Sequence, residues 1–208
     1  MNKNVLVHLL AMRFGYKKCL ILRTPLTGPD CRIELLKGSV SEVKDIFYRC
    51  PAISGGIEFS EIEFPEFQIA LLDPWHSYEA SLRDLRTIYE LLPVGGALVC
   101  HDCWPREEIT KPDGWDACMR GGEWSGETWK AWIDFAVQTN SPYWTVDADY
   151  GCGVIFKGPY EVAGRSVVPL ELTYRFLAGE GHRFLNLIPP QVFIDGVRSG
   201  IIGPGVGS

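Results

Sequence analysis

One stretch in the middle of the chain, residues 67–104, combines two hydrophobic periods. It opens with a short apolar run, residues 67–72, of the kind found in strands buried on both faces, and the run stops at Asp73. Hydrophobic residues then recur at three- and four-residue steps, which predicts a helix that a proline and a glycine pair end. A second apolar run, residues 97–100, leads within two residues to Asp102. The pattern therefore predicts strand, helix and strand, with a carboxylate beyond the end of each strand.

The connection between the two strands predicts where these carboxylates lie. A right-handed crossover places consecutive parallel strands side by side or nearly so. Asp73 and Asp102 would then lie close together at the carboxyl edge of the sheet, where α/β folds bind their ligands. We therefore expect an α/β domain built on a mostly parallel sheet, with its site at this edge.

The remaining pattern predicts further elements on both sides of this unit. We expect helices over residues 4–14, 41–48, 127–137, 169–177 and 180–187, and strands over residues 19–22, 32–36, 143–146 and 153–156. Asp149, Tyr150 and Gly151 between the last two strands indicate a hairpin. Residues 105–122 show no periodicity, which is typical of a lid or binding loop. We expect one domain over residues 1–190 and a C-terminal tail over residues 191–208.

Composition and charge exclude several classes of function. A chain of 208 residues with 46% hydrophobic residues is long enough for one globular domain. The net charge of -6 argues against nucleic acid as the main partner, because phosphate binding calls for a basic face. No apolar run approaches the roughly 20 residues that span a membrane. We see no signal peptide, and the seven cysteines lack paired metal spacing, so we expect a cytoplasmic protein with reduced thiols.

The two strand-end carboxylates suit a hard divalent cation. Mg²⁺ takes oxygen ligands and commonly needs only one or two carboxylates from the protein. Structural roles compete with this interpretation: Asp73 could cap the helix that begins near Ser77, and His76 could be a structural histidine. Asp102 is less easily explained by capping, because no clear helix follows it.

A resemblance to a known family rests on several motifs taken together. They are Asp73-Pro74-Trp75-His76-Ser77-Tyr78-Glu79, Asp84, Leu92-Pro93-Val94-Gly95-Gly96, His101-Asp102, Asp147 to Ile155 and Phe184 to Ile188. Over residues 67–190 the chain resembles the class I S-adenosylmethionine-dependent methyltransferases, and within them a small O-methyltransferase-like group. The resemblance implies a Rossmann-like sheet that ends in an antiparallel hairpin, here residues 143–156.

The resemblance also implies roles for individual residues. S-adenosylmethionine would be the cofactor, bound by residues at strand ends and turns: Thr24, Gly28, Gly38, Ser39, Asp73 and Trp75. A metal ion, Mg²⁺ by preference, would be held by Asp73, Asp102 and His101, and would lower the pKa of an acceptor hydroxyl. His76 would be the general base, since an imidazole with a pKa near 6.5 suits that task. The acceptor would be a small hydroxylated molecule or a sugar.

The amino-terminal half departs from the family pattern. Ile21 stands where the family has an acidic residue, and Arg23 stands where it has the first glycine of a turn. A helix, a strand and the carboxylate that binds ribose are missing from the expected order, so this half is shortened. The alternative is therefore a catalytically inactive binding or regulatory module, and a third hypothesis is a metal-assisted hydrolase. The shortened half would expose part of the sheet, which favours a homo-oligomer.

Overall fold

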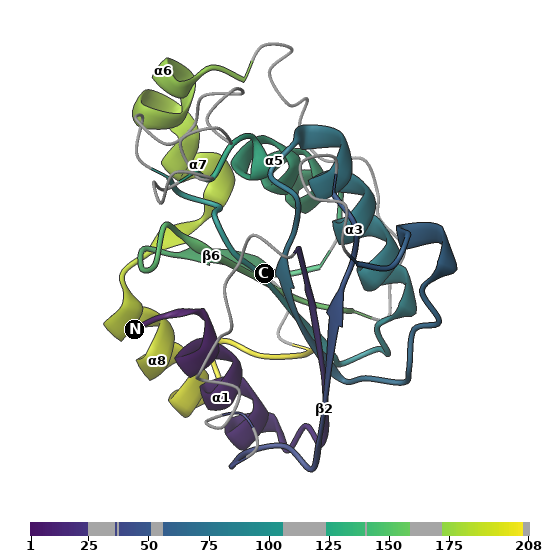
Figure 1. The fold of residues 1–208 in the computed structure, drawn as a ribbon. Helices are drawn as coiled ribbons and strands as arrows, with labels where there is room; N and C mark the ends of the chain where they lie inside the picture. The colour runs from purple at the N-terminus through teal and green to yellow at the C-terminus, as the bar shows by residue number, and fades with distance from the viewer. Residues whose placement is uncertain are drawn as a thin grey trace.

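A seven-stranded sheet runs through the middle of the molecule. The structure, a computed structural model, describes residues 1–24, 36, 38–50, 56–105, 124–139, 141–158 and 172–205. The strands lie in the order β2-β1-β3-β4-β6-β5-β7, and helices cover both faces of the sheet (Figure 1). Gly28, most of the expected strand 32–36 and residues 106–122 of the expected loop lie outside these ranges.

The elements have the following bounds. The strands are β1 (Lys18–Arg23), β2 (Glu42–Phe47), β3 (Ile69–Asp73), β4 (Ala97–Cys100), β5 (Tyr143–Val146), β6 (Cys152–Phe156) and β7 (Leu187–Ile188). The helices are α1 (Lys3–Phe14), α3 (Tyr78–Leu91), α5 (Thr128–Gln138), α6 (Tyr174–Phe176), α7 (His182–Leu185) and α8 (Pro190–Ser199). A short 3₁₀ helix, η1 (Phe59–Glu61), and a π-helical turn, η3 (Leu177–Gly181), complete the described elements.

The direction of the strands confirms the expected fold class. Strands β2, β1, β3 and β4 are parallel neighbours. β6 pairs antiparallel with both β4 and β5, so the predicted hairpin is present, and the short strand β7 adds a parallel edge beyond β5. The domain is therefore α/β with a Rossmann-like, mostly parallel sheet, and β3 and β4 are adjacent, as the crossover argument required.

Each face of the sheet has its own hydrophobic core, because successive side chains of a strand point to opposite faces. Leu20 and Leu22 of β1 pack with α3 and α5, together with the fully buried Trp129 and Trp132. Ile21 packs on the other face, beneath α1 and α8. Because both faces of the sheet are covered, the central strands are mostly apolar, and their hydrophobic runs could be recognised in the sequence.

The helix predicted over residues 41–48 is wrong, because this segment is the edge strand β2. Its side chains are mostly exposed or half-buried, and Ile46 is the one buried residue of the strand. Such a polar edge strand gains its backbone partners from β1, a long-range pairing that local periodicity does not encode. Charged side chains such as Glu42 and Lys44 are typical of edges that resist pairing with another chain.

The homo-oligomer expected from the sequence stays a prediction.

The expected tail over residues 191–208 is also wrong where the structure describes it. α8 lies against α1, and its Phe193 and Val197 are buried in the core beneath the sheet. Arg13 of α1 donates from Nε to the Val197 carbonyl oxygen at 3.0 Å. The helices α1 and α8, from opposite ends of the chain, therefore pack together on one face of the sheet (Figure 1).

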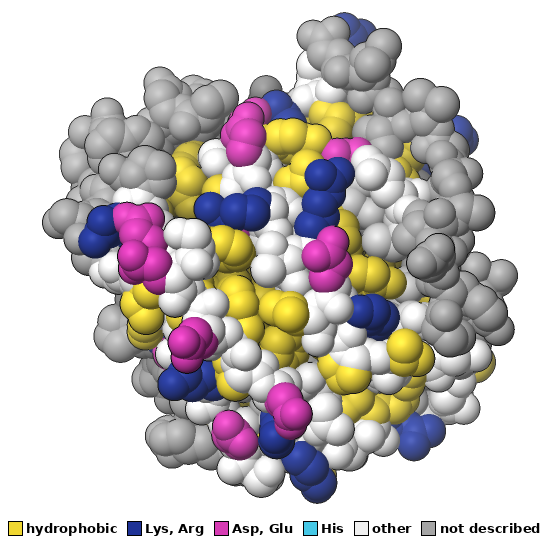
Figure 2. Space-filling view, turned by 90° about the vertical axis from the view of Figure 1, so that its right-hand side faces the viewer, with side chains coloured by type: hydrophobic (Ala, Val, Ile, Leu, Met, Phe, Trp, Pro, Cys, Tyr) yellow, Lys and Arg dark blue, Asp and Glu magenta, His cyan; other side chains and the backbone are white. Residues whose placement is uncertain are grey.

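The surface carries charges of both signs. On the face turned to the viewer in Figure 2, acidic and basic side chains are interspersed, with hydrophobic side chains between them. None of the helices in the described ranges is long and apolar enough to cross a bilayer. The expectations of no nucleic-acid partner and of a cytoplasmic location remain predictions from the sequence.

Candidate functional site

The carboxyl ends of β3 and β4 bring three predicted site residues together. Asp73 is the last residue of β3, Asp102 follows β4 by two residues, and His76 lies in the turn before α3. His76 Nε2 lies 3.1 Å from Asp102 Oδ2 and 3.5 Å from Asp73 Oδ1. One ligand atom from each residue lies within 4.8 Å of the others, an arrangement that could hold a metal ion. The convergence expected from the strand order is therefore present.

The local sequence explains how the turn after β3 leaves Asp73 available for the site. Ser77 caps α3, since its side chain accepts a hydrogen bond from the Ala80 N–H, so Asp73 does not cap this helix. The Ser81 hydroxyl donates to the Trp75 carbonyl oxygen at 3.1 Å and fixes the turn onto the first turn of α3. The structural alternative for Asp73 is thereby excluded, and its carboxylate faces the cluster instead.

The segments that carry the site hold an unusual backbone conformation. Among the described residues, four that are not glycine have positive φ, and three of them lie here: Asp102 (61°), Asp149 (53°) and Tyr150 (59°). The Cys103 and Trp104 N–H groups donate to the carbonyl oxygens of Gly151 and Tyr150, which fastens the end of β4 to the hairpin. Left-handed conformations of this kind gather at functional sites, because the surrounding contacts have to hold them.

Gly151 makes this close approach possible, and its replacement gives a testable effect. Gly151 has φ +84°, and an added Cβ would lie 2.2 Å from the Trp104 backbone nitrogen. We expect Gly151→Ala to lower the free energy of unfolding by about 3 kcal/mol, from conformational strain plus overpacking. Gly15→Ala is the control, with φ +70° but open space around the Cβ, and should lower it by about 1 kcal/mol. Urea denaturation measures both; equal losses would contradict the steric argument.

His76 is oriented by a partner on each ring nitrogen. Nδ1–H donates to the Trp124 carbonyl oxygen at 2.6 Å, which leaves Nε2 to face the two carboxylates. Burial by itself lowers the pKa of His76, but the charges of Asp102 and Asp73 outweigh it and raise the pKa above its usual value. A ring held in this way presents a basic nitrogen to whatever proton or cation lies between it and the carboxylates.

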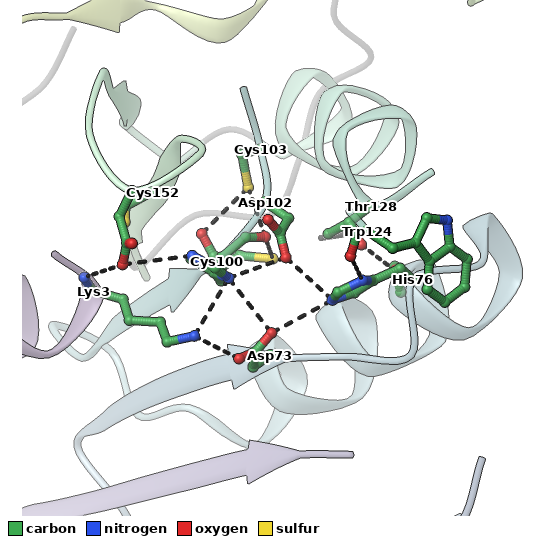
Figure 3. Close-up of polar contacts among 12 residues, drawn as sticks. Lys3, Asp73, His76, Cys100, Asp102, Cys103, Trp124, Thr128 and Cys152 are labelled. Carbon is green, nitrogen blue, oxygen red and sulfur yellow. Dashed lines mark hydrogen bonds and ion pairs between the residues drawn. The ribbon is translucent and has the colours of Figure 1, made fainter. Parts of the chain in front are cut away.

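Three further charged groups complete a buried cluster around these residues. Lys3 Nζ donates to Asp73 Oδ2 at 2.6 Å, and the Lys3 backbone N–H donates to Asp149 Oδ2 at 3.0 Å. His101 lies between carboxylates, with Nδ1 3.0 Å from Asp102 Oδ2 and Nε2 3.5 Å from Asp149 Oδ2. Figure 3 shows these contacts as one continuous network from α1 to the turn before α3. The first residue of α1 thus reaches the strand ends.

Opposite charges set the protonation states in this cluster. Burial alone raises the pKa of Asp73, but Lys3 and His101 outweigh burial and hold the pKa well below its usual range. Burial lowers the pKa of His101, yet Asp102 and Asp73 raise it well above the ordinary value. Despite its burial, Asp149 has a pKa of about 2, because His101 and the Lys3 N–H stabilise its charged form. The raised pKa of His101 favours its charged imidazolium form, and the role of His101 as a metal ligand stays a prediction.

The residues predicted to bind the cofactor are not all at this edge. The Thr24 N–H donates to the Asp73 carbonyl oxygen at 3.3 Å, so these two residues are neighbours at the ends of β1 and β3. Gly38 and Ser39 precede β2, which is parallel to β1, and therefore lie at the opposite edge of the sheet. Their prediction rested on a turn that follows a strand, and the structure does not bring them to Asp73.

Trp75 and Asp84 of the motif have contacts that explain them structurally. The Trp75 ring packs at 67° on Trp124 with 4.8 Å between centroids, in the core beneath α5. The Trp75 N–H donates to the Tyr48 hydroxyl at 2.7 Å, and that hydroxyl donates to Asp84 Oδ2 at 2.5 Å. These bonds tie the turn to the end of β2, so Trp75 supports the site by positioning the turn. A contact to cofactor stays a prediction.

Arg23, which replaces a glycine of the family pattern, is turned away from the strand end. Its guanidinium pairs with Asp45 through Nε (3.0 Å) and Nη2 (2.6 Å) and lies 4.3 Å from the Phe47 ring centroid. Asp45 lies opposite Ile21 in the β1–β2 register, two residues before the partner of Arg23. The side chain therefore folds back along the sheet and does not extend beyond β1.

Comparisons with known proteins give a likeness of fold. No family model matches the chain, and no curated protein does so either. Among solved structures, human N-acetylserotonin methyltransferase in complex with SAM is 16% identical over 74% of this chain, with a TM-score of 0.48. Streptomyces venezuelae DesVI is 11% identical over 76% of this chain and 91% of its own length, also with a TM-score of 0.48.

A third solved structure has a similar level of likeness to this chain. N-methyltransferase NodS from Bradyrhizobium japonicum, in complex with S-adenosyl-L-homocysteine, is 14% identical over 76% of this chain and 86% of its own, with a TM-score of 0.43. This chain spans about half the length, 52%, of the human enzyme. Likenesses at this level concern the fold alone, so evidence on the chemistry has to come from the chain's own residues.

Proposed function

We propose that this chain is an S-adenosylmethionine-dependent methyltransferase that transfers a methyl group to a hydroxyl of a small molecule or sugar. The observation that carries the proposal is the convergence of Asp73, His76 and Asp102 at the carboxyl edge of adjacent parallel strands. His76, whose pKa is raised, lies between two carboxylates at the edge of the sheet where α/β folds bind ligands. This arrangement suits proton abstraction. The motif resemblance in the same segment assigns the reaction.

In this proposal His76 takes the proton of the acceptor hydroxyl at Nε2. The Trp124 carbonyl oxygen holds Nδ1–H, so the basic nitrogen keeps one orientation. Asp102, 3.1 Å from Nε2, stabilises the imidazolium that forms. Asp73 does the same from 3.5 Å, and Lys3 keeps Asp73 ionised. The chain's own residues thus supply a base, its orientation and the charges that stabilise its protonated form.

The described residues are compatible with the cofactor. S-adenosylmethionine would supply the methyl group to the deprotonated oxygen. Thr24 and Asp73 are neighbours at the ends of β1 and β3, and the Arg23 guanidinium pairs with Asp45 of β2. Cofactor roles for Thr24, Gly28 and Trp75 belong to this proposal.

The donor set also fits a divalent cation. Asp73 and Asp102 offer carboxylate oxygens, which suit Mg²⁺ and would leave His76 Nε2 to act as the base. When bound, the ion would lower the pKa of the acceptor hydroxyl. The Cys103 thiol is no candidate for a further ligand here, since Sγ donates back to the Cys100 carbonyl oxygen at 3.3 Å and burial raises its pKa well above the usual value.

Calorimetric titration of S-adenosylmethionine and of its demethylated product, each with and without Mg²⁺, tests the proposal. We expect micromolar binding of both compounds, and a change in affinity or proton release when Mg²⁺ is added. A folded protein that binds neither compound would overturn the proposal in favour of a binding module on a methyltransferase-like scaffold. Binding of the metal alone would favour the metal-assisted hydrolase.

A further inference from the structure

A cavity of about 560 Å³ adjoins the charged cluster. Three segments line it: the residues after β4, the turn between β5 and β6, and the stretch from Tyr174 to Ala178. Asp149 belongs to both the cavity wall and the cluster, because it lines the cavity while its carboxylate faces Lys3 and His101. A ligand in the cavity would therefore lie directly beside the candidate site.

The wall of this cavity is built from backbone conformations that need support. Asp149 and Tyr150 have positive φ, and the π-helical turn η3 supplies Leu177 and Ala178. π-Helical turns and left-handed residues are costly, and both occur preferentially at functional sites. Two such features in separate segments of one wall indicate a binding site and not a packing defect.

The chemistry of the wall selects a positive charge. Trp104, Tyr150 and Tyr174 contribute aromatic rings, and Asp147 and Asp149 contribute carboxylates. No lysine or arginine is among the described residues that line the cavity. Aromatic rings attract ammonium groups through their electron-rich faces, and carboxylates pair with them, whereas the two carboxylates would repel an anion.

The two carboxylates are not equally available to a ligand. Asp149 is held by the Lys3 N–H at 3.0 Å and by His101 at 3.5 Å. Asp147 is exposed, and the described part of the chain gives its carboxylate no ion-pair partner. Its backbone is fixed, since the Asp147 N–H donates to the Ile188 carbonyl oxygen at 3.0 Å. Asp147 is thus a positioned negative charge at the cavity.

We propose that this cavity binds the acceptor through a protonated amino group, with Asp147 as its ion-pair partner and the aromatic wall around it. The acceptor would be a small hydroxylated amine, whose hydroxyl lies toward the charged cluster. The role of the bound amine as acceptor rests on the proposed methyltransferase function. Binding of an amine in the cavity requires neither cofactor nor turnover. The net charge of -6 adds a general attraction for a cationic ligand.

Three phenols that differ only in charge test this proposal by binding alone. Tyramine carries an ammonium group, 4-ethylphenol is neutral, and 3-(4-hydroxyphenyl)propionate is an anion of similar size. We expect tyramine to bind at least tenfold more tightly than 4-ethylphenol, and the anion to bind more weakly than either, in titrations followed by ligand-observed NMR at pH 7.5. The full chain is used without S-adenosylmethionine, so failure of methyl transfer would not affect the outcome.

Two substitutions separate a local ion pair from the overall charge of the protein. Asp147→Asn should reduce the preference for tyramine over 4-ethylphenol to about threefold or less. Asp195→Asn, which removes an exposed carboxylate from α8, should leave the preference unchanged. Circular dichroism confirms that both variants are folded. Equal binding of the three phenols, or a tyramine preference that survives Asp147→Asn, would overturn the proposal.

Discussion

His76→Ala is expected to reduce turnover by at least about 100-fold, the lower end of what a general base contributes. The ring is held by Trp124 at Nδ1 and faces Asp102 and Asp73 at Nε2, so no neighbouring group can take its place without rearrangement. Affinity for S-adenosylmethionine should change by less than threefold, because the proton transfer concerns the acceptor. Initial rates with an acceptor identified in a binding screen measure turnover. Calorimetry measures the affinity for S-adenosylmethionine.

A matched control separates a role in proton transfer from the loss of any histidine. His182→Ala removes an exposed ring in α7, away from the cluster, and should keep turnover within about twofold of the original chain. Imidazole in the buffer should restore part of the turnover of His76→Ala, since the missing ring leaves space for it. Turnover that survives His76→Ala, or that imidazole fails to raise, would remove His76 from the proposed mechanism as the base.

Lys3→Met is expected to lower the free energy of unfolding by about 3 kcal/mol, because it leaves a buried carboxylate without its principal cation. The Lys3 side chain is 18% exposed and that of Asp73 only 3%, and their charged atoms lie 2.6 Å apart. Methionine keeps most of the volume of the stem, so the loss reports charge more than packing. Urea denaturation followed by tryptophan fluorescence gives the difference.

An exposed ion pair provides the comparison for Lys3. Lys18 pairs with Glu66 at 3.0 Å, but both side chains are exposed, so Lys18→Met should leave the urea midpoint nearly unchanged. The double variant Lys3→Met with Asp73→Asn should recover at least about 1 kcal/mol of the loss, as expected for coupled groups. If the effects of the two substitutions on the free energy of unfolding are additive, Lys3 and Asp73 do not stabilise each other. That result would contradict the ion pair between them.

The sequence predicted the parts of the fold that depend on burial. β3 and β4 are apolar at every position because both faces of the sheet are covered, and α1 ends at Gly15 because its C-cap has φ 70°. Parallel strands joined by a helix end at one edge, so the meeting of Asp73 and Asp102 followed from their positions in the chain. These inferences needed no knowledge of distant contacts.

Errors occurred where a distant contact decides the local structure. Residues 42–47 form a strand only because β1 offers its edge, and their polar side chains gave no clear period. Burial of Phe193 and Val197 in the core holds α8 in place. The Gly-rich end of the chain gave no indication of this burial. Gly38 and Ser39 lie at the edge of the sheet opposite Asp73 because they precede β2, which the pairing of β2 with β1 decides.

Lys3 could not be found from the sequence, and Asp149 was recognised only as a hairpin residue, although both belong to the candidate site. They lie 146 positions apart and meet because the first turn of α1, a helix that packs on one face of the sheet, reaches the strand ends beside the hairpin. No motif marks a lysine at the start of a helix as a partner for an aspartate 70 residues later. The sequence by itself therefore determined the adjacent strands β3 and β4, their shared carboxyl edge and the pair of carboxylates there, since hydrophobic periodicity and the hand of a crossover need no distant contact. Tertiary structure alone decided which cations surround that pair, because the positions of those side chains depend on how distant segments pack.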